Sequence, residues 1–331
     1  IDPKTGQPTK KIDYKVLNGQ KEVKKILFEH DGKSTELTFS YVKNNGMYNI
    51  INEPGKYTEQ YFVTQMPQSK KNIIEFNDSI YLLDIENSSI SKFLKDEVDG
   101  YDIKKAIVYS EEKGVITWAS NPSFNLYGTK MVFYTQRNVL KDGDSNGEFW
   151  VKDLLTGDEK FLCKKNFTAL GWDTDDNLYV ENFESLEKIN TSNGESEIII
   201  PQASSYALSY PYLLYQVERG HLNIVNLVTN KETEFKHEAL YRVGFFRVNK
   251  EADSPWILML NIPESDESLN TMPKLNVVFL NLKTMEAKVL PEPPNSQIRD
   301  CNWMGEGIVL VNVWDKSINS EITYTININS L

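Results

Sequence analysis

An acidic loop with the pattern D-x-D-x-N-G carries the most specific chemistry in this sequence. Its candidate metal ligands are Asp142, Asp144, Asn146 and Glu148. Calcium takes six to eight oxygen ligands, and alternate side chains of such a loop converge on one cation, while the glycine permits the sharp turn. The same residue types are also typical of a solvated hairpin turn. Calcium is therefore the one cofactor that the sequence suggests, and an ordinary turn is the alternative.

The other residue types that perform chemistry are dispersed along the chain. The three histidines lie far apart in sequence, and Cys163 and Cys301 have no spacing typical of a metal site or a disulfide framework. The sequence also contains no G-x-S-x-G nucleophile motif. We therefore identify no catalytic residue and favour a non-enzymatic role.

Aromatic residues form the second candidate site. Three tyrosines flank a proline turn, and two further aromatic residues precede them in predicted loops. Such rings could receive a peptide or a sugar, although packing between strands is the default role of an aromatic side chain. The candidate ligand-binding residues are Trp118, Tyr127, Tyr206, Tyr210 and Tyr212.

Short strands in antiparallel meanders must position these residues. The clearest copy has a strand before Gly128, strands at 130–135 and 148–154, and a fourth strand ending at Leu162. Weaker copies recur downstream. An Asp or Asn ends the third strand of each copy, where its side chain can bond the backbone two residues on. These turn-closing residues are Asp84, Asp153, Asn190, Asn226, Asn281 and Asn327.

The repeat predicts an all-β fold, a β-propeller of four-stranded antiparallel blades. Six third strands favour six blades, and residues 36–65 supply a possible seventh. The last copy lacks a fourth strand, which would leave an unpaired sheet edge. We therefore expect an N-terminal strand, at 12–17 or 23–30, to close the ring. Residues 1–11 are expected to form a flexible tether and residues 12–331 a single propeller domain.

The clearest copy resembles the repeat of TolB-like propellers, which is related in shape to WD repeats. Pro122, Phe124, Gly128, Asp153 and Gly157 match that pattern. The Ser-Pro-Asp part of the family repeat is replaced here, so we expect the usual turn chemistry to be lost in this copy; the replacing residues are Asn125, Leu126 and Tyr127. The resemblance implies an exported or periplasmic protein that binds other proteins, but fold alone does not assign function.

The charge balance restricts the partners of this 331-residue chain. Its formal net charge is −11, which disfavours nucleic acid and an anionic membrane surface. The polar residues 1–11 suggest an exported chain that followed a removed signal or an anchor, because residue 1 is not methionine. We therefore expect an extracytoplasmic protein that meets a membrane only through such an N-terminal anchor, as a lipoprotein or membrane-anchored protein would.

The favoured hypothesis is a binding or scaffold module that uses loops at one propeller face to bind a protein, peptide or carbohydrate. Its longest insertions are at 95–116, 137–147 and 263–274. One alternative is a hydrolase or lyase acting on a carbohydrate or lactone at the central channel. Another is the extracellular sensor domain of a membrane-anchored protein.

Overall fold

The structure is a computed structural model with well-defined strands over most of the chain. It describes residues 15–16, 21–30, 32–44, 46–51, 61–67, 69–77, 79–94, 97–98, 101–102, 119–136, 147–165, 167–182, 185–249, 254–264, 274–305 and 307–331. In these ranges the fold is all-β, and η2 (Ile328–Ser330), a three-residue 3₁₀ helix, is the one helix whose full length is described. Accordingly, no helix of the described ranges has the length and apolar character that a membrane span needs. The chain groups into two units, Lys21–Pro201, and Ile1–Gln20 with Gln202–Leu331. Each unit is described separately below, and the numbers of sheets refer to its described residues.

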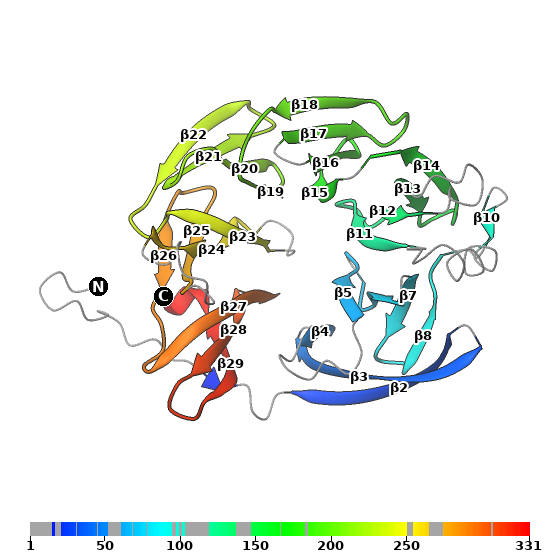
Figure 1. The fold of residues 1–331 in the computed structure, drawn as a ribbon, viewed down its shortest axis with the longest axis horizontal. Coiled ribbons are helices and arrows are strands. Elements are labelled where there is room, and N and C mark those ends of the chain that lie inside the picture. The colour runs from blue at the N-terminus through cyan, green and yellow to red at the C-terminus, as the bar shows by residue number, and fades with distance from the viewer. Residues whose placement is uncertain are drawn as a thin grey trace, which may run out of the picture. The chain divides into compact units, whose positions relative to one another are not determined.

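The unit Lys21–Pro201 contains one three-stranded and three four-stranded antiparallel sheets, together with a small hairpin (Figure 1). The first sheet is β2 (Glu22–His30), β3 (Lys33–Asn44) and β4 (Met47–Ile51). The second is β5 (Tyr61–Gln65), β6 (Asn72–Phe76), β7 (Ser79–Asp84) and β8 (Ser89–Lys92). The third is β11 (Ser120–Phe124), β12 (Lys130–Thr135), β13 (Glu148–Asp153) and β14 (Glu159–Cys163). The fourth is β15 (Thr168–Trp172), β16 (Asn177–Asn182), β17 (Ser185–Asn190) and β18 (Ser196–Ile200), and the hairpin is β9 (Glu97–Val98) with β10 (Tyr101–Asp102).

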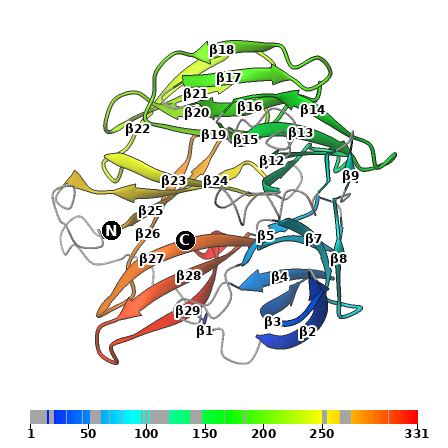
Figure 2. The same ribbon diagram turned by 45° about the vertical axis from the view of Figure 1, so that its right-hand side comes forward.

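The other unit contains three four-stranded antiparallel sheets (Figure 2). The first is β19 (Ser205–Ser209), β20 (Tyr212–Gln216), β21 (His221–Asn226) and β22 (Lys231–Lys236). The second is β23 (Arg242–Val248), β24 (Trp256–Ile262), β25 (Asn276–Asn281) and β26 (Ala287–Leu290). The third is β27 (Ser296–Gly305), β28 (Ile308–Asp315), β29 (Ser320–Asn327) and the N-terminal β1 (Lys15–Val16).

The described residues thus form seven blade-like sheets, so the prediction of six blades is wrong. The additional sheet occupies Glu22–Ile51 rather than residues 36–65, and Tyr61–Gln65 belongs to the sheet that follows. Counting turn-closing Asp and Asn residues missed it because the described residues of this sheet form three strands, with no turn to a fourth strand among them. Its chain reverses at tight turns instead, where Gly32 and Gly46 have positive φ angles of 72° and 76°.

The predicted N-terminal strand is confirmed. Strand β1 pairs antiparallel with β29 in the register Lys15↔Thr325 and Val16↔Tyr324, and it becomes the fourth strand of that sheet. The pairing covers an edge that β29 would otherwise expose. The alternative segment, 23–30, instead lies in β2. The predicted tether, 1–11, lies outside the described residues.

Neighbouring sheets of a unit pack face to face. Strand β13 shows why its sequence is apolar at successive positions: Trp150 packs into a cluster with Ile73 and Ile80, whereas Val151 packs with Trp172 on the other side. Successive strand residues point to opposite faces, so a sheet buried on both faces needs apolar residues at both. Burial of one such large side chain contributes about 2–3 kcal/mol.

The turn-closing residues act as the sequence predicts. The Oδ1 atom of Asp153 accepts the N–H of Leu155 at 2.8 Å, and that of Asn190 accepts the N–H of Ser192 at 2.8 Å. The side chains of Asn226, Asn281 and Asn327 accept equivalent bonds, while Asp84 bonds the N–H three residues on. In chain order, the turn-closing residues from Asp84 to Asn281 are each followed, four residues later, by a residue with a positive φ angle. These residues are Ser88, Gly157, Gly194, Asn230 and Met285.

Candidate functional site

Three exposed apolar side chains lie on two joined turns of the sheet β11–β14. Leu126 and Tyr127 occupy the β11–β12 turn and Leu155 the β13–β14 turn, with exposed fractions of 41%, 51% and 80%. The two turns are held together because the Leu154 N–H donates to the Thr129 carbonyl at 2.8 Å. We call these three residues the turn patch, and the end of the sheet that carries them the turn edge. Three apolar residues together on a turn edge are a stronger sign of a contact surface than single exposed ones.

Asn125 fixes the turn that presents Leu126 and Tyr127. Its fully buried side chain accepts the N–H groups of Thr129 and Lys130 at 2.8 and 3.0 Å. Its Nδ2 donates to Thr129 Oγ1 at 2.9 Å and to Asp176 Oδ1 at 2.8 Å. The expectation that this copy has lost its turn chemistry is therefore wrong, because an amide performs the role. The replacement of Ser-Pro-Asp instead changes the exposed residues of the turn, Leu126 and Tyr127, which are apolar.

Asp176 joins this turn to the turn edge of the neighbouring sheet, β15–β18. Its Oδ2 pairs with Lys130 Nζ at 2.6 Å. Although burial raises the pKa of this carboxyl, the hydrogen bonds from Lys130 and Asn125 bring the pKa below its ordinary value. Thr191 in the β17–β18 turn donates its hydroxyl to the Asp176 carbonyl at 2.8 Å. The turn edges of the two sheets are therefore joined by hydrogen bonds and an ion pair into one connected surface.

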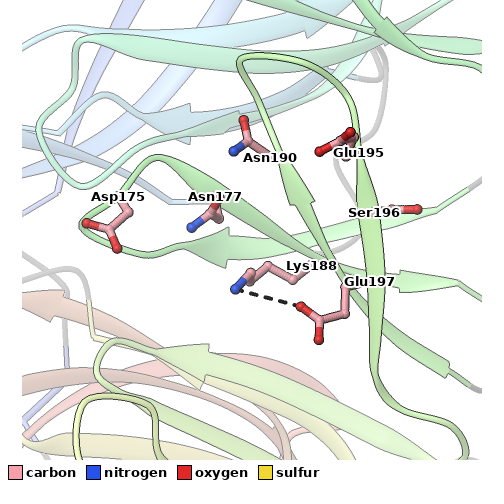
Figure 3. A pocket seen from close by; sticks show the side chains of 7 residues that line it. All are labelled: Asp175, Asn177, Lys188, Asn190, Glu195, Ser196 and Glu197. Carbon is pink, nitrogen blue, oxygen red and sulfur yellow. Dashed lines mark ion pairs between the residues drawn. The ribbon is translucent and has the colours of Figure 1, made fainter.

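An acidic hollow lies beside this surface, lined by residues of β16, β17 and β18 and of the turns that precede β16 and β18 (Figure 3). Its volume is about 730 Å³. Three carboxylates and one ammonium line it, and the ammonium of Lys188 lies 4.0 Å from Glu197 Oε2. The lining residues are Asp175, Asn177, Lys188, Asn190, Glu195, Ser196 and Glu197. At neutral pH the hollow carries net negative charge.

The predicted calcium ligands are described only in part. Asp142, Asp144 and Asn146 lie outside the described residues. Glu148 is buried in β13, and its Oε1 accepts the indole N–H of Trp150 at 2.7 Å. Over the part of the chain that the structure describes, no three His, Cys, Asp or Glu side chains cluster as a metal site would need. Calcium binding by the loop remains a prediction from the sequence.

The predicted aromatic site divides between the two units. Trp118 lies outside the described residues, Tyr127 belongs to the turn patch, and Tyr206 is buried in β19 opposite Tyr215. Tyr210 and Tyr212 flank the β19–β20 turn. Tyr212 packs against the core of its unit and lines a cavity of about 140 Å³ together with residues of the β25–β26 turn.

The described strands also place Tyr127 away from the two residues that flank the insertion at 137–147. Strand β12 runs from Lys130, beside the Tyr127 turn, to Thr135. Gln136 and Gly147, the described residues on either side of 137–146, therefore lie at the other end of this sheet from the Tyr127 turn. Sequence reasoning did not single out Leu126 and Leu155; the available signal was the replacement of Pro-Asp by Leu-Tyr in the repeat.

Neither cysteine is suited to nucleophilic chemistry at neutral pH. Burial raises the pKa of Cys163 to about 11, against a smaller lowering effect of Lys165. Cys301 is fully buried in the core of its unit, and burial raises its pKa well above the ordinary thiol value. Both thiols stay protonated near pH 7, and the thiolate is the reactive form.

Comparisons with known proteins identify the fold. No family model and no curated protein matches this chain. One similar structure is the extracellular domain of BT4673 from B. thetaiotaomicron, assigned to a one component system, at 10% identity and a TM-score of 0.53, covering 98% of this chain and 43% of that one. Another is PorZ, a bacterial surface component of the type-IX secretion system of Porphyromonas gingivalis, at 11% identity and a TM-score of 0.50, covering 88% and 36%. A protein assigned as TolB from Agrobacterium tumefaciens also matches, at 10% identity and a TM-score of 0.49, covering 81% and 90%.

At such low identity these matches show the fold alone, and this chain spans less than half of the BT4673 and PorZ chains. The β-propeller fold predicted from the repeat is confirmed, with sheets of three or four strands serving as blades. The suspected resemblance to TolB-like propellers agrees with this fold.

Proposed function

We propose that this chain is an extracytoplasmic binding module that contacts a protein partner through the turn patch. The observation that carries the proposal is the exposure of Leu126, Tyr127 and Leu155 on two turns that are bonded to each other. Interface cores are enriched in tyrosine and other apolar side chains, whereas turns of monomeric proteins are ordinarily polar.

The rigidity of the turns supports the same proposal. Side chains on a flexible loop lose conformational entropy on binding, which reduces the net affinity. The four hydrogen bonds of Asn125 fix the Tyr127 turn before any partner arrives. Burial of Tyr127 and Leu155 would then contribute up to about 1.5–3 kcal/mol each, a sizeable share of the roughly 8 kcal/mol that a micromolar contact represents.

Similarity to exported propeller domains supports the extracytoplasmic part of the proposal. The BT4673 match is described as an extracellular domain, and PorZ as a surface component. The BT4673 description also favours a second candidate, in which this chain is the extracellular sensor domain of a membrane-anchored protein. In both cases the propeller binds a ligand outside the cytoplasm.

Selection from a random-peptide display library on the immobilised full chain tests the binding role. We expect clones enriched on the wild-type chain to lose affinity by about 30-fold or more on the double variant Tyr127→Ser/Leu155→Ser, because two apolar contacts are removed. Val228→Ser is the matched control, since Val228 is 66% exposed at the corresponding turn position of the other unit. Clones that bind the wild-type chain, the double variant and the control variant equally would refute the proposed contact surface.

A further inference from the structure

We infer that the partner segment is basic as well as apolar: it places an apolar side chain on the turn patch and Lys or Arg side chains over the acidic hollow. This inference rests on the proposed binding function and adds the chemistry of the ligand. Acidic residues alone would not identify a ligand. Here they adjoin an exposed apolar patch on the same connected surface.

The charge of the turn edges supports a basic partner. The four turns at 125–130, 153–158, 173–177 and 190–195 contain six carboxylates and one lysine. The carboxylates are Asp153, Asp158, Asp173, Asp175, Asp176 and Glu195. A surface with this imbalance attracts a cationic segment and repels an anionic one.

Two groups of these carboxylates have different tasks. Asp153 and Asp173 accept backbone N–H groups of their own turns, and Asp176 is paired with the one lysine, Lys130. Asp158, Asp175 and Glu195 are exposed on the same edge, and Glu195 also accepts a hydrogen bond from Asn193 Nδ2 at 2.8 Å. The exposed carboxylates are therefore the groups that a partner can reach.

The hydrogen bonds between the turns join the patch to the hollow. Asn125 Nδ2 bonds Asp176 Oδ1 at 2.8 Å, and Asp175, which lines the hollow, is the adjacent residue. A single extended segment can therefore reach from Tyr127 to Asp175 and on to Glu195 without leaving the connected surface. Long, flexible lysine and arginine side chains suit an open hollow lined by carboxylates.

The corresponding turns of the other unit provide a contrast. Val228 is exposed there as Leu155 is here. The turns between the third and fourth strands there, at 226–231 and 281–286, carry two lysines, Lys231 and Lys283, and one carboxylate, Glu286, whereas the equivalent turns at 153–158 and 190–195 carry three carboxylates and no lysine. An exposed apolar residue is present on that surface but the negative charge is not, so a basic segment should discriminate between the two surfaces.

The display selection described above also tests the partner chemistry when one charge variant and one control variant are added. Peptides enriched on the full chain are sequenced, resynthesised and titrated by fluorescence anisotropy at low and high salt. The charge variant is Asp175→Lys/Glu195→Lys, in which both substituted side chains are exposed. The control is Glu232→Lys/Glu234→Lys, which reverses two carboxylates of β22 in the other unit.

We expect the enriched peptides to combine Lys or Arg with an apolar residue. We also expect the charge variant to weaken them by about tenfold at low salt, because two attractions become repulsions, and less at high salt. The control variant should leave the affinity within about twofold. Enriched peptides without basic residues, lost on Tyr127→Ser/Leu155→Ser but unaffected by the charge variant, would overturn this inference and leave the proposed function intact. No enrichment on the wild-type chain would overturn both.

Discussion

Replacement of Asn125 by alanine gives the sharpest test of how the turn patch is held. The substitution removes two acceptor bonds, to the N–H groups of Thr129 and Lys130, and two donor bonds, to Thr129 Oγ1 and Asp176 Oδ1. A hydrogen bond contributes about 0.5–1.5 kcal/mol net, and a buried donor left without a partner costs about 1–3 kcal/mol. We therefore expect Asn125→Ala to lower the free energy of unfolding by about 3 kcal/mol.

Thermal unfolding followed by circular dichroism measures this loss. For a chain of this length the unfolding entropy is about 0.7 kcal/mol per degree, so a loss of 3 kcal/mol lowers Tm by about 4 °C. Asn193→Ala is the matched control, because Asn193 is also a turn asparagine but is exposed and bonds only to Glu195 in the contacts described. If Asn125→Ala loses no more stability than Asn193→Ala, the buried network does not hold the turn.

A charge variant separates the donor bonds from the acceptor bonds. Asn125→Asp keeps the acceptor oxygen but replaces the donating NH₂ group by a second oxygen, which places a carboxylate against Asp176, whose Oδ1 lies 2.8 Å from the present amide nitrogen. We expect Asn125→Asp to destabilise the chain at pH 7 and less at pH 4, where one of the two carboxyls takes up a proton. Adding Asp176→Asn should restore stability at pH 7, since an amide again faces a carboxylate. A pH-independent loss that Asp176→Asn leaves unchanged would contradict the assignment.

Three further predictions follow from the turns and the acidic loop. Gly157→Ala should lower the free energy of unfolding by about 1 kcal/mol, because φ is +76° but the space around the new Cβ is open. Gly194→Ala should lower it by at least about 2 kcal/mol more, because its Cβ would meet the Leu162 carbonyl oxygen at 2.5 Å. Equal Tm losses for the two variants would contradict this prediction. Backbone N–H bonds lower the pKa of Asp153, so its contribution to stability is present above the unfolded-state pKa and is lost as the pH falls through the folded-state value. Asp153→Asn should therefore lower Tm at pH 7, and the difference from the wild type should shrink below about pH 4; a difference in Tm that does not change with pH would argue against that role. Calcium binding by the acidic loop predicts a rise in Tm with millimolar calcium that Asp144→Ala abolishes, and no rise would remove the metal hypothesis.

Local chemistry explains which parts of the fold could be predicted. The bonds of Asp153 and Asn190 to their own turns depend on neighbouring residues only, so their sequence pattern locates the third strand of each copy. The closing strand followed from a general requirement, since the last copy lacked a fourth strand. The sheet Glu22–Ile51 was missed because its described residues form three strands, so the Asp or Asn that ends a third strand before the turn to a fourth is not found among them. The Asp-Gly and Asn-Gly sequences at 31–32 and 45–46 indicate tight hairpin turns instead of the turn that marks the repeat.

The site was harder to predict because exposure depends on tertiary packing. Tyr127 and Tyr206 look alike in the sequence, yet one is half exposed at a turn and the other is buried in a strand. Leu155 gave no signal, because leucine usually indicates core. Asn125 was misjudged although its bonds to Thr129 and Lys130 are local, because an asparagine performs the turn role that Ser-Pro-Asp usually has. Only its bond to Asp176, 51 residues further along the chain, depends on the next sheet.

The central claim is that partners bind at the turn edge of the β11–β18 sheets and not at the long insertions. Titration of one display-selected peptide against two variants of the full chain tests it most directly: Tyr127→Ser/Leu155→Ser, and a chain in which residues 265–273 are replaced by a short glycine-serine linker. Both variants must keep the wild-type Tm to be informative about binding. The account predicts that the turn variant loses binding and the insertion variant keeps the wild-type Kd. Retained binding by the turn variant, with loss in the insertion variant, would contradict it.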